Sequence, residues 1–433
     1  MNNTYPKKIL IVNVHSTLNA GDSALLWLNI RQFEKIFPEA NFTALVNYPN
    51  ETFYKRITNL IVMPSPFALI KAGTELSNWK KIIRLVVGCM IMMIGMVLPR
   101  SLLANTQSNW LQMAYIYRST DVIGAVSGAQ LVSLGSYSWP LIISSLPIVF
   151  AHLFHKPLYI MPQSIGPFRW KWEKSLVKEI YSRARLIFLR DNISIRLANE
   201  IGIPERIIKF ASDPGFALPA ASREQALEIM SGYGYMSDQH AIGITVVSRL
   251  SRIFDRERFD SYYHSLASSL NRFLQVYEAK IYIFDQVTGP TFDEDDRFAT
   301  EILLNMIAED QNRIIHVDHR LNPMELKACY SLMDMFIASR LHSGIFAMSS
   351  GVPTFFIGYN PKTRGVLEAA GLEQWMLDLD NLDTNVFYEL LCQTWENRES
   401  IADKTRTVVM NCLKDFGRVS QFIAEDYLNA RKP

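Results

Sequence analysis

The sequence FIASRLHSGIFAMSSGVPTFFIGYNPKTRGVLEAAG, from Phe336 to Gly371, decides the fold. It begins within a short apolar run, Met335–Ala338, which predicts a buried strand, and a polar cluster follows at Ser339–Gly344. The next segment, Ile345–Ser350, has apolar residues at helical spacing and stops at a Gly-Val-Pro turn. A second apolar run, Thr354–Ile357, predicts another buried strand. This order of elements predicts one βαβ unit of a parallel sheet.

Two side chains with useful chemistry lie in the polar loop after the first of these strands. Open α/β folds bind ligands at the carboxyl edge of the sheet, where the following helix also presents free N–H groups. Arg340 offers a planar fork for a carboxylate or phosphate, and His342 titrates near neutral pH. The pair therefore suits an acidic substrate that exchanges a proton. The alternative is that both residues cap the helix or pair with surface carboxylates.

Strand, loop and helix units recur along the whole chain. They predict an α/β fold of two doubly wound Rossmann-like domains that face one another across a cleft. We place the N-terminal domain at residues 1–222, with an apolar insertion at about 80–100, and the C-terminal domain at 240–415, followed by a tail at 416–433. No G-x-G-x-x-G follows the first strand and no P-loop is present, which argues against nicotinamide and ATP chemistry.

The composition limits the partners and the location. A chain of 433 residues with 49% apolar and 20% charged content is long enough to fold around two cores. Its 44 basic and 42 acidic residues nearly balance, so we expect no nucleic-acid partner, and any anion site must be local. The four cysteines lack metal spacing, and the polar N-terminus lacks a secretory signal. We therefore expect reduced thiols and a cytoplasmic protein.

The loop from His15 to Asp22 follows the first predicted strand. We predict that Asp22 or Ser23 is the N-cap of the next helix. Asp22 is also a candidate base for an acceptor hydroxyl, because a loop at a strand end would face the cleft. Both roles stay open at this point.

Polar residues also end several other predicted strands. Ser127 lies among small residues that let a ligand approach the backbone, and Gln163 ends the next strand. Arg190 and Arg249 follow later strands, and each is a candidate anion contact. The alternative for these arginines is an ion pair with a neighbouring carboxylate. A run of carboxylates at Asp293–Asp296 is predicted as a solvated helix start rather than a metal site, because consecutive side chains point in different directions.

Five motifs in order resemble those of the polysaccharide pyruvyl transferase family. The first is Asn19-Ala20-Gly21-Asp22. The last lies in the stretch from Phe336 to Gly371, and it consists of Ser-Arg-Leu-His, the Gly-Val-Pro turn, Tyr-Asn and Lys362. The motifs between them are Gln163-Ser164-Ile165-Gly166-Pro167, Arg190-Asp191 with Ser194, and Asp213-Pro214.

The resemblance implies a reaction and a fold. The enolpyruvyl group of phosphoenolpyruvate would be transferred to two hydroxyls of one sugar, which forms a cyclic pyruvate ketal and releases phosphate. The family fold is similar to the two-domain GT-B glycosyltransferase architecture. It implies an acceptor side in the N-terminal domain and a phosphoenolpyruvate side in the C-terminal domain. The scheme requires neither a cofactor nor a metal.

The chemistry of the implied reaction suggests roles for individual residues, and the role of Asp22 rests on its position alone. His342 would protonate carbon 3 of phosphoenolpyruvate, and Asp22 would accept the proton of the attacking hydroxyl. The carboxylate and phosphate call for a clamp of two or more arginines, with Arg340 the first candidate. The further predicted substrate contacts are the N–H of Leu341, Arg190, Arg249, Asn19, Gly21, Ser127, Gln163 and Lys362.

Residues Leu85–Leu98 form an uncharged, mostly apolar run flanked by Lys80, Lys81, Arg84 and Arg100. The run is short for a transmembrane helix, which needs about 20 residues. Basic flanks favour contact with the inner face of the plasma membrane, where a lipid-linked oligosaccharide acceptor would lie. A buried core helix is the alternative.

Two other functions stay open. One is a nucleotide-sugar-dependent glycosyltransferase on the same fold, which would bind a uridine or guanosine diphosphate sugar. The other is a non-catalytic, membrane-associated scaffold of a polysaccharide assembly complex, in which the Leu85–Leu98 segment would capture the partner.

Overall fold

The chain forms two compact units, each with its own parallel sheet. The computed structural model describes residues 6–49, 57–68, 78–133, 138–248, 256–307, 311–318, 320–359, 361–379 and 382–430. Unit 1 comprises Met1–Thr17, Leu25–Ala211 and Gly417–Pro433, and unit 2 comprises Leu18–Ala24 and Ser212–Phe416. The predicted α/β fold with two Rossmann-like domains is confirmed. The main segment of unit 2 starts at Ser212, before the predicted end of the first domain at residue 222.

The sheet of unit 1 has the strand order β3-β2-β1-β4-β5-β6-β7. All its strand pairs are parallel, and the order reverses between β1 and β4. Because the sheet is covered on both faces, β1, β4 and β5 are almost entirely buried, which explains their continuous apolar sequences. The strands are β1 (Lys8–Ser16), β2 (Asn41–Tyr48), β3 (Leu60–Pro64), β4 (Val122–Ala125), β5 (Leu158–Gln163), β6 (Leu186–Leu189) and β7 (Ile208–Phe210).

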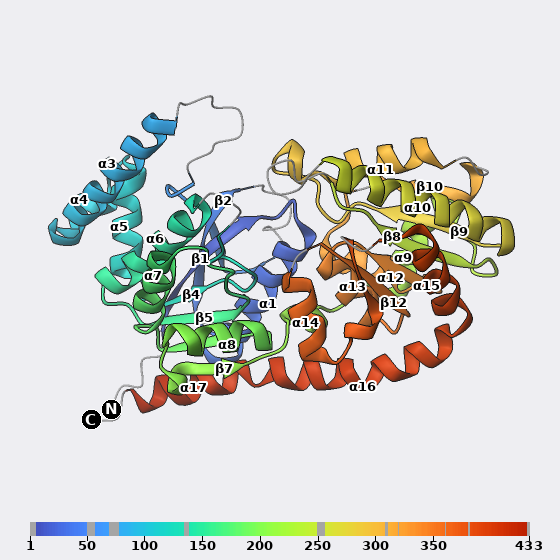
Figure 1. Cartoon of the computed structure of the whole chain (residues 1–433). Coiled ribbons are helices and arrows are strands. Elements are labelled where there is room, and N and C mark those ends of the chain that lie inside the picture. Colours follow the sequence, from blue (N-terminus) through green and yellow to red (C-terminus); the bar gives the residue numbers. More distant parts are fainter. Residues whose placement is uncertain are drawn as a thin grey trace. The chain divides into compact units, whose positions relative to one another are not determined.

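Helices flank this sheet (Figure 1). The last helix of the chain packs here, since Asp426 accepts hydrogen bonds from Tyr159 and Arg185. The helices are α1 (Ala20–Ile36), α3 (Asn78–Val97), α4 (Arg100–Ala104), α5 (Asn109–Ser119), α6 (Trp139–Leu153), α7 (Lys171–Tyr181), α8 (Asn192–Ile201) and α17 (Val419–Asn429), with a 3-10 turn η1 (Glu205–Ile207).

The sheet of unit 2 has the order β10-β9-β8-β11-β12-β13, which repeats the topology of the first six strands of unit 1. Its strand pairs are also parallel, and its order reverses between β8 and β11. In open α/β sheets this reversal is where ligands bind. The strands are β8 (Ala241–Thr245), β9 (Lys280–Phe284), β10 (Ile314–Val317), β11 (Met335–Ala338), β12 (Thr354–Gly358) and β13 (Met376–Asp378).

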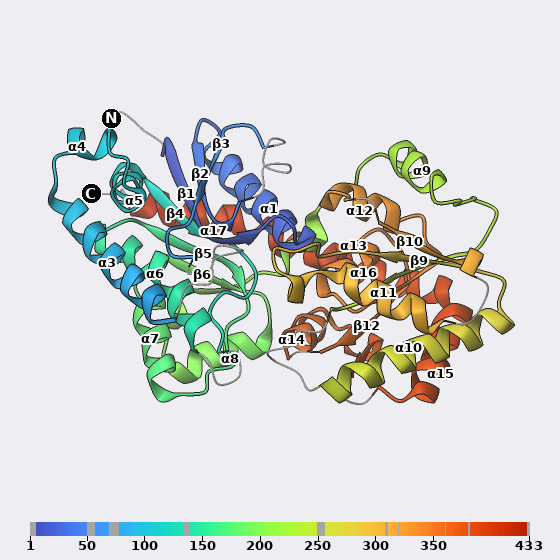
Figure 2. The same ribbon diagram turned by 90° about the horizontal axis from the view of Figure 1, so that it is seen from above.

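Helices also flank the second sheet (Figures 1 and 2). The α-helices are α9 (Arg223–Ser231), α10 (Arg256–Val276), α11 (Asp296–Met306), α12 (Pro323–Tyr330), α13 (Leu341–Met348), α14 (Pro361–Ala370), α15 (Thr384–Glu396) and α16 (Arg398–Gly417). The 3-10 turns are η2 (Pro214–Ala217), η3 (Phe292–Glu294), η4 (Gln311–Arg313) and η5 (Glu373–Trp375).

The stretch from Phe336 to Gly371 has the predicted order of strand, helix and strand, but its helix begins at Leu341, within the polar cluster that we predicted as a loop. Strand β11 is followed by α13 and then by β12, and Phe336 pairs in register with Thr354. Arg340 occupies the N-cap position of α13, although its side chain makes no capping hydrogen bond. Arg340 and His342 therefore lie at the carboxyl edge of β11, beside the point where the strand order reverses.

The N-cap predicted for the first helix is wrong. Helix α1 begins at Ala20, so Asp22 and Ser23 lie inside its first turn. Asn19 caps the helix instead, because its Oδ1 accepts hydrogen bonds from the N–H groups of Gly21 and Asp22 at 2.9 and 3.4 Å. The helix starts earlier than its apolar pattern indicated, since Ala20 and Gly21 carry little periodic signal.

The apolar segment forms one long helix, α3, that lies along the outside of unit 1 (Figure 2). One face packs on α5, and the opposite face is exposed, so the predicted alternative of a buried core helix is wrong for that face. None of the helices in the described part of the chain is both long enough and apolar enough to cross a membrane.

Candidate active site

His342 is held between two glycine backbones and a buried carboxylate. Its Nε2 lies 3.8 Å from Oδ1 of Asp213, which is within the range of charge attraction. The Asp213 carboxylate is fixed by the N–H of Gly215, which donates to Oδ1 at 2.8 Å. A Cβ added at Gly215 would lie 3.4 Å from Cδ2 of His342, so this backbone forms one wall beside the imidazole.

Gly21 forms the other wall. A Cβ added there would lie 2.3 Å from Nδ1 of His342, closer than side chains in proteins approach one another. The imidazole therefore occupies space that only glycine leaves open. Three of the sequence motifs meet at this point within unit 2: the one that begins at Asn19, the one that begins at Asp213 and the one that contains His342.

The segment that carries Gly21 is tied to the second sheet by backbone hydrogen bonds. The N–H of Ala20 donates to the carbonyl of Gln286 at 3.0 Å, and the N–H of Thr288 donates to the carbonyl of Leu18 at 2.8 Å. Asn19 and Val287 form an antiparallel bridge. These bonds fix the position of Gly21 against His342.

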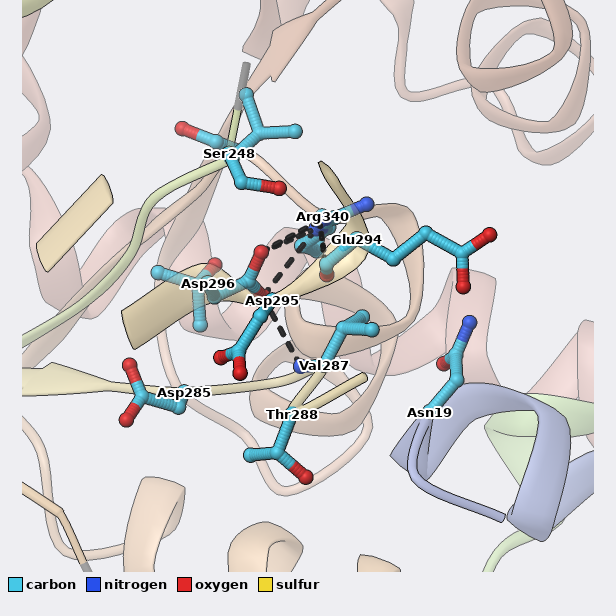
Figure 3. A network of polar contacts seen from close by, with 12 residues as sticks. Asn19, Ser248, Asp285, Val287, Thr288, Glu294, Asp295, Asp296 and Arg340 are labelled. Carbon is cyan, nitrogen blue, oxygen red and sulfur yellow. Dashed lines mark hydrogen bonds and ion pairs between the residues drawn. The ribbon is translucent and has the colours of Figure 1, made fainter. Parts of the chain in front are cut away.

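Arg340 forms an ion pair with Asp296, a residue with no exposed side-chain surface. The Nε of Arg340 donates to Oδ1 of Asp296 at 3.1 Å, and Nη2 donates to the same carboxylate and to the carbonyl of Glu294. Asp296 Oδ2 in turn accepts the N–H of Val287 at 2.9 Å. Figure 3 shows this arrangement, with Asn19 on the neighbouring helix.

The Arg340 guanidinium keeps one donor available. Its Nη1 lies 3.5 Å from the hydroxyl of Tyr359, which is the acceptor for this nitrogen among the described residues. A guanidinium has five N–H groups, and the contacts with Asp296, Glu294 and Tyr359 account for four of them. Within the part of the chain that the structure describes, one Nη1 hydrogen therefore has no acceptor and is available to an anionic ligand.

Burial and charge act against each other in this pair. Burial raises the pKa of Asp296 to about 6, although the positive charge of Arg340 opposes the shift. Burial by itself would lower the pKa of Arg340, but the charge of Asp296 outweighs it and raises that pKa. At neutral pH both groups are charged, so the pair is an oriented donor whose net charge is close to zero.

The predicted solvated helix start at Asp293–Asp296 is wrong for its last two residues. Asp295 is buried and caps α11 by accepting the N–H of Arg297, and Asp296 is the fully buried partner of Arg340. A carboxylate can be buried in this way because the guanidinium and a backbone N–H satisfy it. Among the described residues, no three His, Cys, Asp or Glu side chains come close enough together to hold a metal ion.

The predicted site residues of unit 1 are held inside their own unit. Gln163 is buried, and its Nε2 donates to the carbonyl of Val126 while its Oε1 accepts the hydroxyl of Tyr181. Ser127 is buried, and its N–H and hydroxyl both bond Asn29. Arg190 is buried as well, and its Nε donates to the hydroxyl of Ser164 at 2.9 Å. Their predicted contacts with substrate stay predictions.

The remaining predicted residues lie at three kinds of position. Asp22 is half-buried in the first turn of α1, and Lys362 is half-buried in the first turn of α14. Leu341 is the first residue of α13, where a helix supplies no internal acceptor for its N–H. Arg249 lies outside the described residues.

A separate hollow of about 570 Å³ lies in unit 1. Residues that precede β4, β5 and β6 line it, so it is at the amino edge of that sheet, the edge opposite the strand ends discussed above. Two of its cations already have partners: Lys156 donates to the carbonyls of Arg118 and Thr120, and Arg185 pairs with Asp426. This hollow is therefore a weaker candidate for an anion site than the loop after β11.

The motifs around His342 agree with the comparison with known families. The Polysaccharide pyruvyl transferase family matches residues 19–361. The chain belongs to this family. The general role of a polysaccharide pyruvyl transferase follows from that membership, and the predicted resemblance is confirmed.

Individual relatives are more distant. The chain is 21% identical over 420 residues to the amylovoran biosynthesis protein AmsJ of Erwinia amylovora, and the match covers 93% of this chain and 95% of AmsJ. Among solved structures, HepE from Anabaena in complex with UDP-glucose is similar with a TM-score of 0.58 at 12% identity, covering 98% and 100% of the two chains. The UDP-GlcNAc 2-epimerase of Neisseria meningitidis bound to UDP-GlcNAc has a TM-score of 0.56 at 12% identity, covering 98% and 100%. These structures show the fold alone, which is of the GT-B type.

The partners of His342 and Arg340 are not evident from the sequence. Asp213 belongs to a motif that indicates no role for it, and the carboxylate run that contains Asp296 predicts a solvated position. The signal for Asp296 was its position after the end of β9, where a carboxylate can face the loop after β11 across the sheet edge. The signal for Gly21 was its place in a motif, and only the three-dimensional contact explains why glycine is required there.

Proposed function

We propose that this chain transfers the enolpyruvyl group of phosphoenolpyruvate to two hydroxyls of one sugar in a cell-surface polysaccharide or its lipid-linked precursor. The products would be a cyclic pyruvate ketal and inorganic phosphate. The observation that carries the proposal is the arrangement of His342, Asp213 and Gly21 beside Arg340 at the carboxyl edge of β11 in a member of this family.

In the proposed reaction, His342 is the acid that protonates carbon 3. Protonation makes carbon 2 electrophilic, and the oxygen of a first sugar hydroxyl forms a bond to it while losing its proton. A second hydroxyl then bonds to carbon 2, the bond from carbon 2 to the phosphate oxygen breaks, and its proton leaves with the phosphate. Asp213 would support this role by holding the imidazole in place, since its Oδ1 lies 3.8 Å from Nε2.

Arg340 and the start of α13 would bind the donor. The remaining Nη1 hydrogen of Arg340 and the N–H of Leu341 both lie at the start of α13, and together they would offer two donors to a carboxylate or phosphate. Asp296 would hold the guanidinium in one orientation, which lowers the entropy lost on binding.

Asp22 would accept the proton of the attacking hydroxyl. It is half-buried and directly follows Gly21, so it lies one residue from the wall of the His342 site. We retain Asn19, Lys362, Arg190 and Arg249 as predicted contacts to donor or acceptor. Ser127 and Gln163 also stay predicted contacts, but they would have to exchange their present hydrogen bonds for a ligand.

Calorimetric titration of phosphoenolpyruvate into the full chain tests the donor site. We expect Arg340→Lys to weaken binding about tenfold, because lysine keeps the charge beside Asp296 but loses the planar fork. Arg340→Lys is preferable to Arg340→Ala, which would leave the buried carboxylate of Asp296 unpaired. With a sugar acceptor present, ³¹P and ¹³C NMR should show phosphate and a ketal carbon appearing together.

The same titration separates the alternatives. Binding of a uridine diphosphate sugar with no response to phosphoenolpyruvate would overturn the proposal in favour of a nucleotide-sugar glycosyltransferase. No binding of either ligand by folded protein, with or without acceptor, would favour the non-catalytic scaffold.

The expected location follows from the proposed acceptor. We propose a cytoplasmic protein at the inner face of the plasma membrane, where a lipid-linked oligosaccharide would present its hydroxyls.

A further inference from the structure

Helix α3 divides sharply into a packed face and an exposed face. The packed face rests on α5: a Cβ added at Gly88 would lie 2.0 Å from the ring of Trp110, and one at Gly95 would lie 2.5 Å from Cβ of Ala114. Met92 on the same face has no exposed surface. The glycines therefore let α3 lie close against α5, which fixes the rotation of the helix about its axis.

The opposite face carries large apolar side chains in solvent. They recur every three or four residues along the whole length of α3, and between 38% and 83% of each is exposed. Soluble proteins rarely leave so continuous an apolar strip uncovered. We call this strip the α3 apolar face, and its members are Trp79, Ile82, Ile83, Val86, Val87, Met90, Met93, Ile94 and Val97.

The charged residues of the sequence segment around α3 have one sign. The sequence contains no Asp or Glu between Glu75 and Asp121, and it contains five basic residues there. Three of these begin the helix next to Trp79, and a fourth follows its end. Arg118 is the exception, because it donates to the carbonyls of Gly95 and Leu98 inside the unit. The other four are Lys80, Lys81, Arg84 and Arg100.

We propose that the α3 apolar face docks on an anionic lipid membrane, with the helix lying in the plane of the interface. A helix whose one face is covered by protein can insert its other, apolar face into the bilayer interface along its whole length. The basic residues at its ends would then pair with the lipid phosphates. Trp79 is suited to the boundary between apolar chains and headgroups.

A second copy of the chain is a poorer occupant. Pairing two α3 apolar faces would bring together two sets of positive charges with no carboxylate in the segment to balance them. An anionic lipid surface supplies both the apolar layer and the opposite charge. This inference rests on α3 alone, so its failure would leave the proposed transfer reaction untouched.

Cosedimentation of the full chain with vesicles tests the inference. We expect binding to vesicles made of equal parts phosphatidylcholine and phosphatidylglycerol, and much weaker binding to phosphatidylcholine alone. Each neutralised basic residue should weaken binding about fivefold, so the variant Lys80→Gln/Lys81→Gln/Arg84→Gln should lose on the order of a hundredfold in affinity. Met90→Asp should lose about tenfold or more.

Met410→Asp is the matched control, because Met410 is an exposed methionine on helix α16 of unit 2, and its vesicle binding should equal that of the wild type. Circular dichroism melts should show that each variant is folded. A wild-type chain that stays in the supernatant with both vesicles would overturn the proposal. So would a Met90→Asp variant that binds like the wild type, or light scattering that shows a dimer broken by Met90→Asp without any vesicle binding.

Discussion

The two sheets of this protein share a strand order but use their carboxyl edges differently. In unit 1, the polar residues at the ends of β4 and β5 bond inside the unit: Gln163 joins Val126 to Tyr181, and Ser127 joins Asn29. In unit 2, the first turn of α13 presents His342 beside Asp213, and Arg340 before it keeps one donor for a ligand among the described residues.

This difference shows that a polar side chain at a strand end can already be engaged within its own unit. To bind a ligand, the side chain must retain donors or acceptors that its own unit has not used. Gln163 has its amide oxygen and amide nitrogen engaged within the core, so binding a ligand there would first cost hydrogen bonds. Binding to the second Nη1 hydrogen of Arg340 would break no hydrogen bond that the described residues make.

The largest expected effect is at the site of unit 2. His342→Gln should lower kcat about 10²- to 10⁴-fold, because glutamine keeps much of the shape but cannot act as an acid near neutral pH. Phosphoenolpyruvate affinity should be retained, since the proposed donor contacts belong to Arg340 and Leu341. Steady-state kinetics and titration of the same preparation measure both. Unchanged turnover would show that His342 is not the acid.

A smaller effect is expected from Gly21→Ala. The added methyl would displace the imidazole of His342, and a misplacement of about 1 Å can reduce kcat on the order of a hundredfold. In a His342→Gln background the same change should have little further effect. Gly417→Ala is the control, because a Cβ there meets no atom within 4 Å. Full activity in Gly21→Ala would mean that His342 is not held by this wall.

The smallest effect on activity, and an effect mainly on stability, is expected in unit 1. Gln163→Leu should lower the free energy of unfolding by about 1–3 kcal/mol, because the Val126 carbonyl and the Tyr181 hydroxyl would lose their buried partner. Denaturant unfolding measures the change in stability, and titration with phosphoenolpyruvate measures any change in ligand binding. A variant of normal stability that no longer binds phosphoenolpyruvate would show that Gln163 acts in the binding site, and the contrast between the two units would then be wrong.

The sequence predicted the βαβ unit around β11 well, because its strands are fully buried and therefore continuously apolar. It also placed Arg340 and His342 at the carboxyl edge of the sheet, because residues that directly follow a parallel strand lie at that edge. Family membership was recognisable because several weak motifs occurred in one order.

Other features depend on contacts that a one-dimensional pattern does not contain. Asp296 belongs to a run of carboxylates that is typical of a solvated helix start. It is buried because the start of α11 lies against Arg340, the residue before α13. The start of α1 was misplaced because the capping residue, Asn19, precedes two residues without apolar periodicity. The packed and exposed faces of α3 could be told apart only once the position of α5 was known. The spacing of Gly88 and Gly95 puts both on one side of the helix, but it does not say that this side is the packed one.

The two faces of α3 also differ in their exposure to oxidants. Met90 and Met93 are about half exposed, whereas Met92, between them in sequence, is completely buried. Mild peroxide should therefore convert Met90 and Met93 to sulfoxides well before it reaches Met92. A sulfoxide is polar, so each conversion would place a polar group in the middle of an otherwise apolar strip. Oxidative damage at two side chains of unit 1 would thus alter the surface of that unit and leave the residues around His342 in unit 2 chemically unchanged.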